Sequence, residues 1–184
     1  ADVAPVIGYL LHEADARARL DLVARTDELT GLGNRRAFNE QAVREVARAV
    51  RHTQDLAILV MDLSRFKRLN DRFGHAVGDE ALQAVADAVR RSVRTGDSIF
   101  RWGGDEFAAL LPHADAVAAA HVARRIAEAV EQVATPGSRL LMNIGAACLP
   151  VDGSDLDGLL TLADDRMYAA KADGNAWLDP DRTG

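Results

Sequence analysis

The sequence predicts an α+β fold in which helices cover a central, mostly antiparallel sheet, with one further helix in front of the domain. The first observation is length, because 184 residues suit one domain and a short appendage. The second is that short apolar runs of strand length alternate with segments of helical periodicity. The third is a Gly pair between two apolar runs, which is typical of a hairpin. We therefore divide the chain into an N-terminal helix, residues 1–25, and one domain, residues 26–184.

The first third of the chain predicts two helices and a central strand. A helix is expected over 2–25, where apolar residues recur three or four positions apart at Ile7, Leu11, Ala14, Ala18 and Leu22. The segment 26–34 (TDELTGLGN) interrupts this pattern with two glycines and several capping side chains, and a helix follows over 35–52. The apolar run 56–61 (LAILVM) suits a strand buried on both faces, and it ends at Asp62. A carboxylate is thus expected at the carboxyl end of a strand.

The rest of the chain predicts further helices and strands in an order typical of an α+β sandwich. Two strands joined by Gly103, Gly104 and Asp105 form the expected hairpin. The predicted elements are a short helix over 64–73, a loop over 74–78, a helix over 79–94, strands over 98–102 and 106–111, a helix over 114–133, a strand over 140–147, a helix over 156–171 and a strand over 175–178.

Charge and composition exclude several classes of protein. With 22 Lys and Arg against 28 Asp and Glu, the net charge is −6 and the pI is about 5.3, so we do not expect binding to DNA or RNA through bulk electrostatics. No apolar run approaches the roughly 18 residues that span a bilayer. The single cysteine, Cys148, cannot form an internal disulfide, which favours a reducing, cytoplasmic setting. The chain begins with Ala rather than Met, so we expect a missing N-terminal part.

Two acidic positions are the strongest candidates for chemistry. Asp62 ends the apolar strand, and Asp105 and Glu106 lie in the hairpin turn. If the hairpin lies beside the strand, these carboxylates meet at one edge of the sheet, an arrangement suited to Mg²⁺ with substrate phosphates. From spacing alone, Asp62 and Asp105 are somewhat better explained as turn formers than as metal ligands. Gly103 and Gly104 fit both interpretations, and in the functional one they let a nucleotide approach the backbone.

The motif around these residues resembles the signature of a known family. Residues 101–107 (RWGGDEF) contain the GGDEF sequence of the diguanylate cyclases. Other blocks of that family follow in order: DELTGLGNRR at 27–36, DLSRFKRLND at 62–71, FGH at 73–75 with GD at 78–79, and MYAAK at 167–171. The resemblance covers residues 27–177 and implies a fold similar to nucleotide cyclases and polymerase palm domains.

The resemblance implies a reaction in which two GTP molecules condense to cyclic di-GMP and release two pyrophosphates. Each domain would hold one GTP, so a homodimer is expected. By motif position, Asp62 and Asp105 would bind Mg²⁺ or Mn²⁺ with help from the Leu63 carbonyl, which would neutralise the triphosphate. Glu106 would assist metal binding or deprotonate the attacking hydroxyl.

The family match also assigns residues that hold the nucleotide. Asn70 and Asp79 stand at the guanine-reading positions, and a carboxylate can accept hydrogen bonds from guanine N1–H and N2–H₂. Without the match, Asn70 is better explained as a helix-end residue and Asp79 as an N-cap. Lys67 and Lys171 would contact the phosphates. Lys67 is also expected among the catalytic residues, with Asp62, Asp105 and Glu106. The full set of expected substrate residues is Asn70, Asp79, Phe66, Lys67, Gly103, Gly104 and Lys171.

A product-inhibition site is also expected. Arg94 and Asp97 form an RxxD motif at the family's offset before the signature, where bound cyclic di-GMP inhibits the enzyme. Arg125 stands where a secondary arginine contributes in some relatives. A helix-end Arg followed by a turn Asp is the simpler alternative.

Two residues depart from the family pattern, and two rival functions remain. Ser64 replaces the usual second Asp of the DxD block, and Asn175 stands where relatives carry Arg, which predicts weaker GTP binding.

The main rival function is a catalytically silent domain that binds GTP or cyclic di-GMP as a regulatory module. The second rival is a nucleotide cyclase or polymerase palm with another product. The N-terminal helix is either the end of a signalling stalk that pairs two subunits, linked to a missing sensor domain, or an amphipathic helix packed on its own domain.

Overall fold

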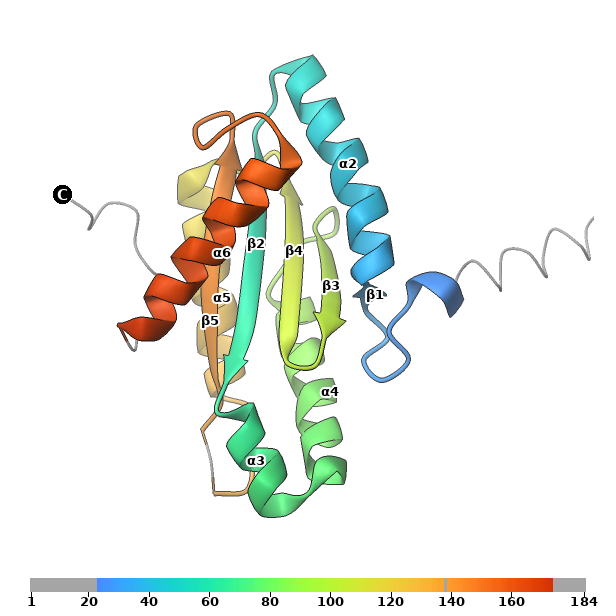
Figure 1. Cartoon of the computed structure of the whole chain (residues 1–184), viewed down its shortest axis with the longest axis vertical. Coiled ribbons are helices and arrows are strands. Elements are labelled where there is room, and N and C mark those ends of the chain that lie inside the picture. The colour runs from blue at the N-terminus through green and yellow to red at the C-terminus, as the bar shows by residue number, and fades with distance from the viewer. Residues whose placement is uncertain (1–22, 138, 174–184) are drawn as a thin grey trace, which may run out of the picture.

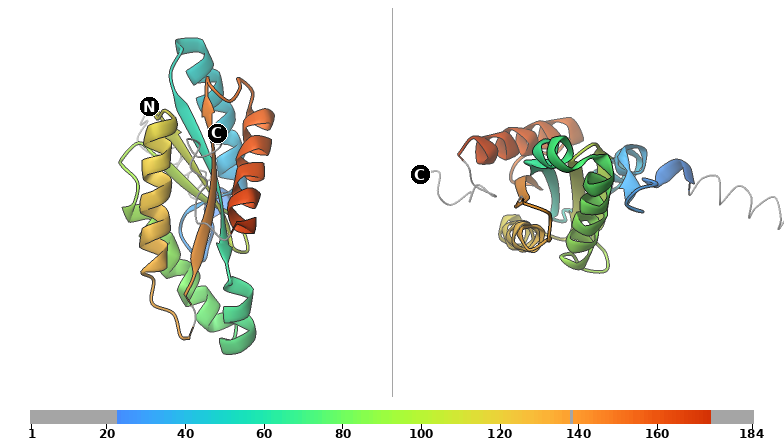
Figure 2. Two further views of the ribbon diagram at one scale, coloured as in Figure 1. Left: turned by 90° about the vertical axis from the view of Figure 1, so that its left-hand side faces the viewer. Right: turned by 90° about the horizontal axis from the view of Figure 1, so that it is seen from below.

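The computed structural model describes residues 23–137 and 139–173, which form a five-stranded sheet covered by helices on both faces (Figures 1 and 2). The strand order is β1-β3-β4-β2-β5; β1 is parallel to β3, and the other pairs are antiparallel. The elements are β1 (Gly33–Asn34), α2 (Arg35–His52), β2 (Leu56–Ser64), α3 (Phe66–Phe73), α4 (His75–Arg91), β3 (Ser98–Gly103), β4 (Glu106–Pro112), α5 (Ala116–Glu131), β5 (Leu141–Leu149) and α6 (Leu156–Ala172). The expected fold class is confirmed.

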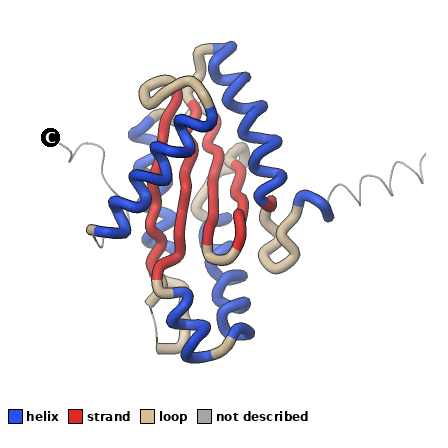
Figure 3. Tube along the Cα trace, viewed as in Figure 1, coloured by secondary structure: helices blue, strands red, loops and turns tan. Residues whose placement is uncertain are grey.

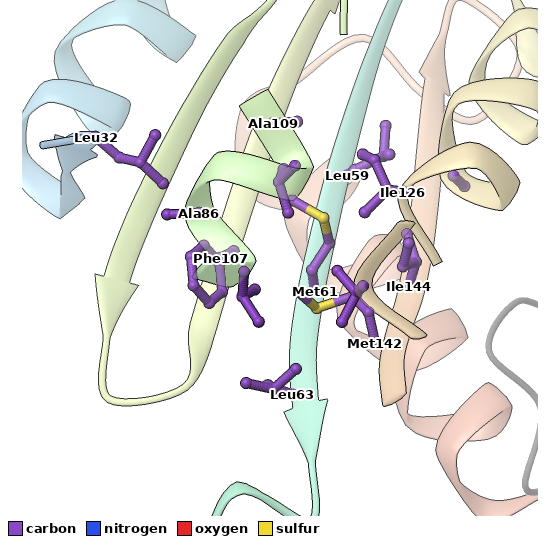
Figure 4. Packing of buried hydrophobic residues seen from close by; sticks show 14 of the residues in the cluster. Leu32, Leu59, Met61, Leu63, Ala86, Phe107, Ala109, Ile126, Met142 and Ile144 are labelled. Atoms are coloured by element: carbon purple, nitrogen blue, oxygen red, sulfur yellow. The ribbon is translucent and has the colours of Figure 1, made fainter. Parts of the chain in front are cut away.

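The sheet separates two hydrophobic clusters, one under each pair of helices. Helices α4 and α5 cover one face, where Met61, Phe107 and Ile126 belong to the larger cluster (Figure 4). Helices α2 and α6 cover the other face (Figure 3). Phe38 and Leu159 belong to the second cluster, on that face. Both faces of β2 are therefore buried, which explains its uninterrupted apolar run.

Strand β2 is longer than its apolar run predicts. The expected strand ends before Asp62, whereas β2 continues to Ser64, so the expectation that Asp62 ends the strand is wrong. The extension has a partner, because β5 pairs with β2 as far as Ser64, opposite Leu141. Strand β4 pairs with β2 only as far as Asp62, opposite Glu106. Asp62 thus still lies at the edge where the β3–β4 hairpin turns.

Some predicted helix boundaries are wrong for local reasons. Helix α4 begins at His75, so the loop expected over 74–78 is mostly helical. Gly74, with φ +86°, separates α3 from α4, whereas Gly78 lies inside α4. Helix α5 begins at Ala116, after the side chain of Asp115 caps it by accepting the Ala118 amide.

Three further segments differ from the prediction or lie outside the described residues. Strand β1 was not predicted, because two residues carry no readable periodicity. Most of the helix expected over 2–25, and all of the strand expected over 175–178, lie outside the described residues. None of the helices in the described ranges combines the length and apolar character needed to cross a membrane.

Candidate active site

The two candidate acidic positions meet at one edge of the sheet. Asp62 of β2 lies directly opposite Glu106 of β4 in the antiparallel register. The next residue, Leu63, donates its amide hydrogen to the carbonyl of Asp105 at 3.0 Å. The turn of the hairpin therefore lies against the end of β2, next to the beginning of α3 (Figure 1). The register and this hydrogen bond place the backbone of all four residues expected to hold a metal, Asp62, Leu63, Asp105 and Glu106, at this edge.

Helix α6 adds a cation to this cluster. The Lys171 ammonium lies 2.6 Å from Oδ1 of Asp62, although the residues are 109 positions apart. The helix lies very close to β5 because Gly145 has no side chain: a Cβ there would lie 1.9 Å from the Ala163 carbonyl oxygen. The position of α6 thus places Lys171 at the carboxylates.

The donor chemistry of this edge fits a divalent cation that is shared with a phosphate ligand. The described residues contain no group of three or more His, Cys, Asp or Glu side chains able to enclose a metal by themselves. Magnesium is commonly held by one or two carboxylates together with substrate phosphates, so a full protein cage is not required. The Lys171 contact shows that the Asp62 carboxylate is placed to accept a cationic partner. Asp62 and Asp105, with the Leu63 carbonyl and Glu106, could hold such an ion.

The hairpin turn requires its glycines for conformation. Gly103 has φ +149° and Gly104 has φ +52°, both in the region that side chains disfavour. A Cβ at either position would meet nothing within 4 Å. The space beside the turn is therefore open, which is compatible with the expected approach of a nucleotide.

A second group of expected residues surrounds a buried oxygen between α3 and α4. The Oδ1 atom of Asn70 is buried and has no hydrogen-bond partner. It lies against Gly78, where a Cβ would be only 1.8 Å away, and Phe66 is the next nearest side chain. Asp79 follows Gly78 and is exposed. Since buried polar atoms are usually paired, the unpaired acceptor of Asn70 marks a place suited to a hydrogen-bond donor from a ligand.

The remaining expected substrate residues differ in their surroundings. Phe66 is buried and packs in the larger hydrophobic cluster, so its observed contacts are those of a core residue. Lys67 is exposed in the first turn of α3. Unlike Lys171, it makes no hydrogen bond or ion pair to Asp62 or Asp105 in the described structure.

The expected inhibitory motif forms a closed local structure. The Asp97 side chain is 2% exposed and accepts from the amide and Nε of Arg94, at 3.1 and 3.2 Å. The same guanidinium, 61% exposed in its side chain, donates to the carbonyl of Pro112 at 2.6 Å. Two open hollows, of about 390 and 480 Å³, share Arg94 and Thr95 in their linings.

Arg125 is engaged elsewhere. Its Nε donates to the carbonyl of Ser92 at 2.7 Å, just after the end of α4. It is absent from the residues that line either hollow around Arg94. The described structure therefore gives Arg125 the contact of a helix-capping side chain.

Two residues near the carboxylates were not predicted. Asn143 is 3% exposed in the otherwise apolar β5, lies opposite Asp62, and accepts a hydrogen bond from the hydroxyl of Ser64 at 2.5 Å. A polar residue within an apolar strand is the signal that would have identified it. Arg101 donates to the carbonyl of Gly104 in the hairpin turn, and no local pattern indicates that contact.

Comparisons with known proteins agree with this arrangement. The family model described as "Diguanylate cyclase, GGDEF domain" matches residues 24–176. The chain is 38% identical over 157 residues to diguanylate cyclase DgcM of Escherichia coli (strain K12), covering 85% of this chain and 38% of that protein. It is 36% identical over 172 residues to the cyclic di-GMP phosphodiesterase NbdA of Pseudomonas aeruginosa, covering 91% of this chain and 22% of that protein. The chain thus spans well under half the length of these relatives.

A solved structure has the same architecture over nearly its whole length. The coiled coil and GGDEF domain of DgcB from Caulobacter crescentus, in complex with c-di-GMP, superimposes with a TM-score of 0.85 at 25% identity and covers 95% of each chain. The element order and the mixed sheet described above are therefore those of a known structural group.

Proposed function

Because the chain belongs to the GGDEF family of diguanylate cyclase domains, we propose that it condenses two GTP molecules into cyclic di-GMP and releases two pyrophosphates. The observation that carries this proposal is the meeting of Asp62 with Asp105 and Glu106 at one sheet edge, beside Lys171. Residues 26–184 would be the catalytic domain, and residues 1–25 would connect it to a sensor domain.

The carboxylate edge would hold Mg²⁺ or Mn²⁺ together with the triphosphate. Asp62 and Asp105 are the main ligands, assisted by the Leu63 carbonyl and Glu106. A bound divalent ion would supply neutralisation of the triphosphate and of the charge that develops at the α-phosphate. Lys171, whose ammonium is already directed at this edge, donates to the phosphates, and the exposed Lys67 does so from α3.

The bond-forming step joins two domains. The 3′-oxygen of one GTP attacks the α-phosphate of the other, the bond to the β-phosphate breaks, and pyrophosphate leaves with its electron pair. The hydroxyl proton passes to a base, for which Glu106 is our candidate. Each domain has one such edge, so the reaction requires a homodimer in which two edges face each other.

Asn70 and Asp79 would read the base. The buried, unpaired oxygen of Asn70 supports this role, because a guanine donor would complete its hydrogen bonding. The Asp79 carboxylate would accept from N1–H and N2–H₂, whereas adenine presents an acceptor at N1. Rejection of ATP follows from leaving a polar group unpaired.

Product inhibition would act at Arg94 and Asp97. The exposed side chain of Arg94, which lines two open hollows, supports binding of a guanine or phosphate there. Arg125, which caps α4 at Ser92, would contribute indirectly by fixing the end of the helix before the motif.

The alternative is a catalytically silent regulatory domain. One relative with 36% identity is named as a phosphodiesterase rather than a cyclase, so similarity alone does not separate these functions. The intact GGDEF sequence at 103–107 favours the enzyme.

Incubation with GTP and Mg²⁺, followed by mass spectrometry, tests the proposal. We expect cyclic di-GMP, and a mixture of ATP and GTP should give no adenine-containing product. Absence of any product from a sample that is dimeric would exclude the cyclase and favour the regulatory module.

A further inference from the structure

One arginine links the hairpin turn to a loop far away in the sequence. Arg101 lies in β3, and its side chain is only 11% exposed. Its Nε and Nη2 donate to the carbonyl of Gly104 at 3.0 and 2.7 Å. Its Nη1 donates to both carboxylate oxygens of Asp27 at 3.0 and 3.2 Å. All three guanidinium nitrogens are therefore engaged, and the planar group has little freedom to rotate.

The hairpin turn is held at two consecutive carbonyls. Arg101 binds the carbonyl of Gly104, and the amide of Leu63 binds the carbonyl of Asp105. The register between β3 and β4 shifts between Arg101 and Gly103, so the regular ladder does not continue through this turn. The Arg101 side chain and the Leu63 backbone amide thus fix the turn at Gly104 and Asp105, where the regular ladder is interrupted.

The other end of the link is equally fixed. One oxygen of Asp27 accepts from the amide and hydroxyl of Thr30, at 2.9 and 2.6 Å. Burial opposes ionisation, but the hydrogen bonds from Thr30 and Arg101 hold the pKa of Asp27 below its ordinary value. The side-chain amide of Asn34 donates to the carbonyl of Ala24 at 3.0 Å, so the loop is also joined to the segment in front of it.

We propose that Arg101 is a positioning residue for Asp105 and Glu106, and that Asp27 orients it, so that the loop over 26–34 sets the placement of the carboxylates. The inference rests on the function proposed above, because it assigns these carboxylates to the reaction. Small displacements of a reacting group have large kinetic effects, since catalysis depends on alignment. An ion pair that only stabilised the fold would alter stability and leave the catalytic step unchanged.

The experiment compares Arg101→Met, Asp27→Asn and their combination with a core control. Val130→Ala removes volume from a fully buried position on α5, so it lowers stability without contacting the turn. Thermal unfolding, kcat for cyclic di-GMP formation, and the affinity for 3′-deoxy-GTP with Mg²⁺ are measured on the whole chain. The analogue lacks the attacking hydroxyl, so its binding reports the ground state alone.

We expect Arg101→Met to lower kcat by about a hundredfold while weakening analogue binding by less than about tenfold. Asp27→Asn should lower kcat by about tenfold and add little to Arg101→Met, because both act through one contact. Arg101→Lys should fall between, since an ammonium cannot bind both partners in the same plane. Equal kcat losses in Arg101→Met and Val130→Ala variants of equal stability would overturn the inference.

A second measurement separates this inference from the proposed function. Hydrogen exchange of the amides at 104–106 should increase in Arg101→Met and in Asp27→Asn but not in Val130→Ala. If the wild-type protein makes no product, the cyclase proposal fails while this comparison still decides the positioning role. Unchanged exchange at the turn in Arg101→Met would show that Arg101 does not hold it.

Discussion

At the scale of single residues, Asp62 is where three parts of the candidate site meet. Glu106 lies opposite it on β4, and Asn143 lies opposite it on β5. Lys171 reaches it from α6. The Lys171 side chain is 45% exposed, so solvent screens this ion pair and its contribution to stability is small. The carboxylate is therefore expected to matter for ligand binding much more than for folding.

Replacing Asp62 tests whether its carboxylate serves ligand binding rather than folding. In Asp62→Asn we expect the free energy of unfolding to change by less than about 1 kcal/mol, because the lost ion pair is partly exposed. Cyclase activity and Mn²⁺-dependent nucleotide binding should both fall by about a hundredfold or more, since a charged metal ligand is lost. Denaturant unfolding, product formation and calorimetric binding measure the three quantities. Asp165→Asn, an exposed change of equal charge on α6, is the matched control, and an equal activity loss there would contradict the prediction.

A second carboxylate, Asp152, makes the stability depend on pH. Burial opposes its ionisation, yet the two hydrogen bonds from Arg166 at 2.8 and 2.9 Å and the one from the Cys148 amide hold the pKa of Asp152 below its ordinary value. Because the pKa of Asp152 is lower in the folded than in the unfolded protein, its stabilisation is complete at pH values above the unfolded-state pKa. The stabilisation is lost as the pH falls through the folded-state pKa.

We therefore expect Asp152→Asn to cost about 1 to 3 kcal/mol at pH 7, because hydrogen bonds to a charged group are lost. The difference from wild type should shrink as the pH falls below about 4. Urea unfolding at a series of pH values measures this, and a difference that stayed constant down to pH 2 would contradict it. Glu40→Gln, which alters an exposed cluster with Arg25 and Arg36, serves as the control for loss of a surface ion pair.

At the scale of elements, the junction of α3 and α4 is shaped around Gly78. This glycine costs α4 some intrinsic helical stability, roughly 1 kcal/mol relative to Ala. It leaves room for the Asn70 side chain, whose Oδ1 would lie 1.8 Å from a Cβ. Glycine at position 78 therefore lowers the helix propensity of α4 but leaves space beside the expected base-reading residues.

The substitution Gly78→Ala tests whether the space beside Asn70 is needed for nucleotide binding. The gain in helix propensity and the displacement of Asn70 oppose each other, so the unfolding free energy should change by no more than about 1 kcal/mol. The affinity for 3′-deoxy-GTP should fall by about tenfold, because a displaced Asn70 leaves one polar group unpaired. Gly158→Ala, at a glycine in the first turn of α6, should leave that affinity unchanged. Wild-type affinity in Gly78→Ala would exclude a base-reading role for Asn70.

The same scale explains what the sequence could and could not predict. The apolar run of β2 and the Gly pair of the hairpin carry local signals, so the meeting of Asp62 with Asp105 and Glu106 was expected and is observed. The predicted start of α4 was wrong because Gly78 is typical of a loop, whereas here a glycine inside the helix leaves room for the Asn70 side chain. Contacts across the chain, such as Arg101 with Asp27, involve residues 74 positions apart and leave no periodic trace.

At the scale of the whole molecule, the proposed reaction requires two copies of the chain. One domain supplies one carboxylate edge, so the rate per subunit must depend on how often two edges face each other. Ala24, before the domain, is connected to it at Asn34, whose side-chain amide donates to the carbonyls of Ala24 and Thr26 at 3.0 and 3.3 Å. A segment that paired two subunits would thus be joined directly to the loop that contacts Arg101.

Comparing residues 1–184 with residues 23–184 tests whether the N-terminal segment pairs the subunits. The shorter chain keeps Ala24 and its contact with Asn34, so its domain should unfold at the same denaturant concentration. We expect it to be monomeric at low micromolar concentration, with specific activity that rises in proportion to protein concentration, because association becomes the limiting equilibrium. Sedimentation and product formation over a hundredfold dilution series measure both properties. Equal activity and equal dimerisation of the two chains would place the dimer contact within 23–184. If the shorter chain lacks only the pairing of subunits, its fusion to an unrelated parallel coiled coil should restore activity at high dilution.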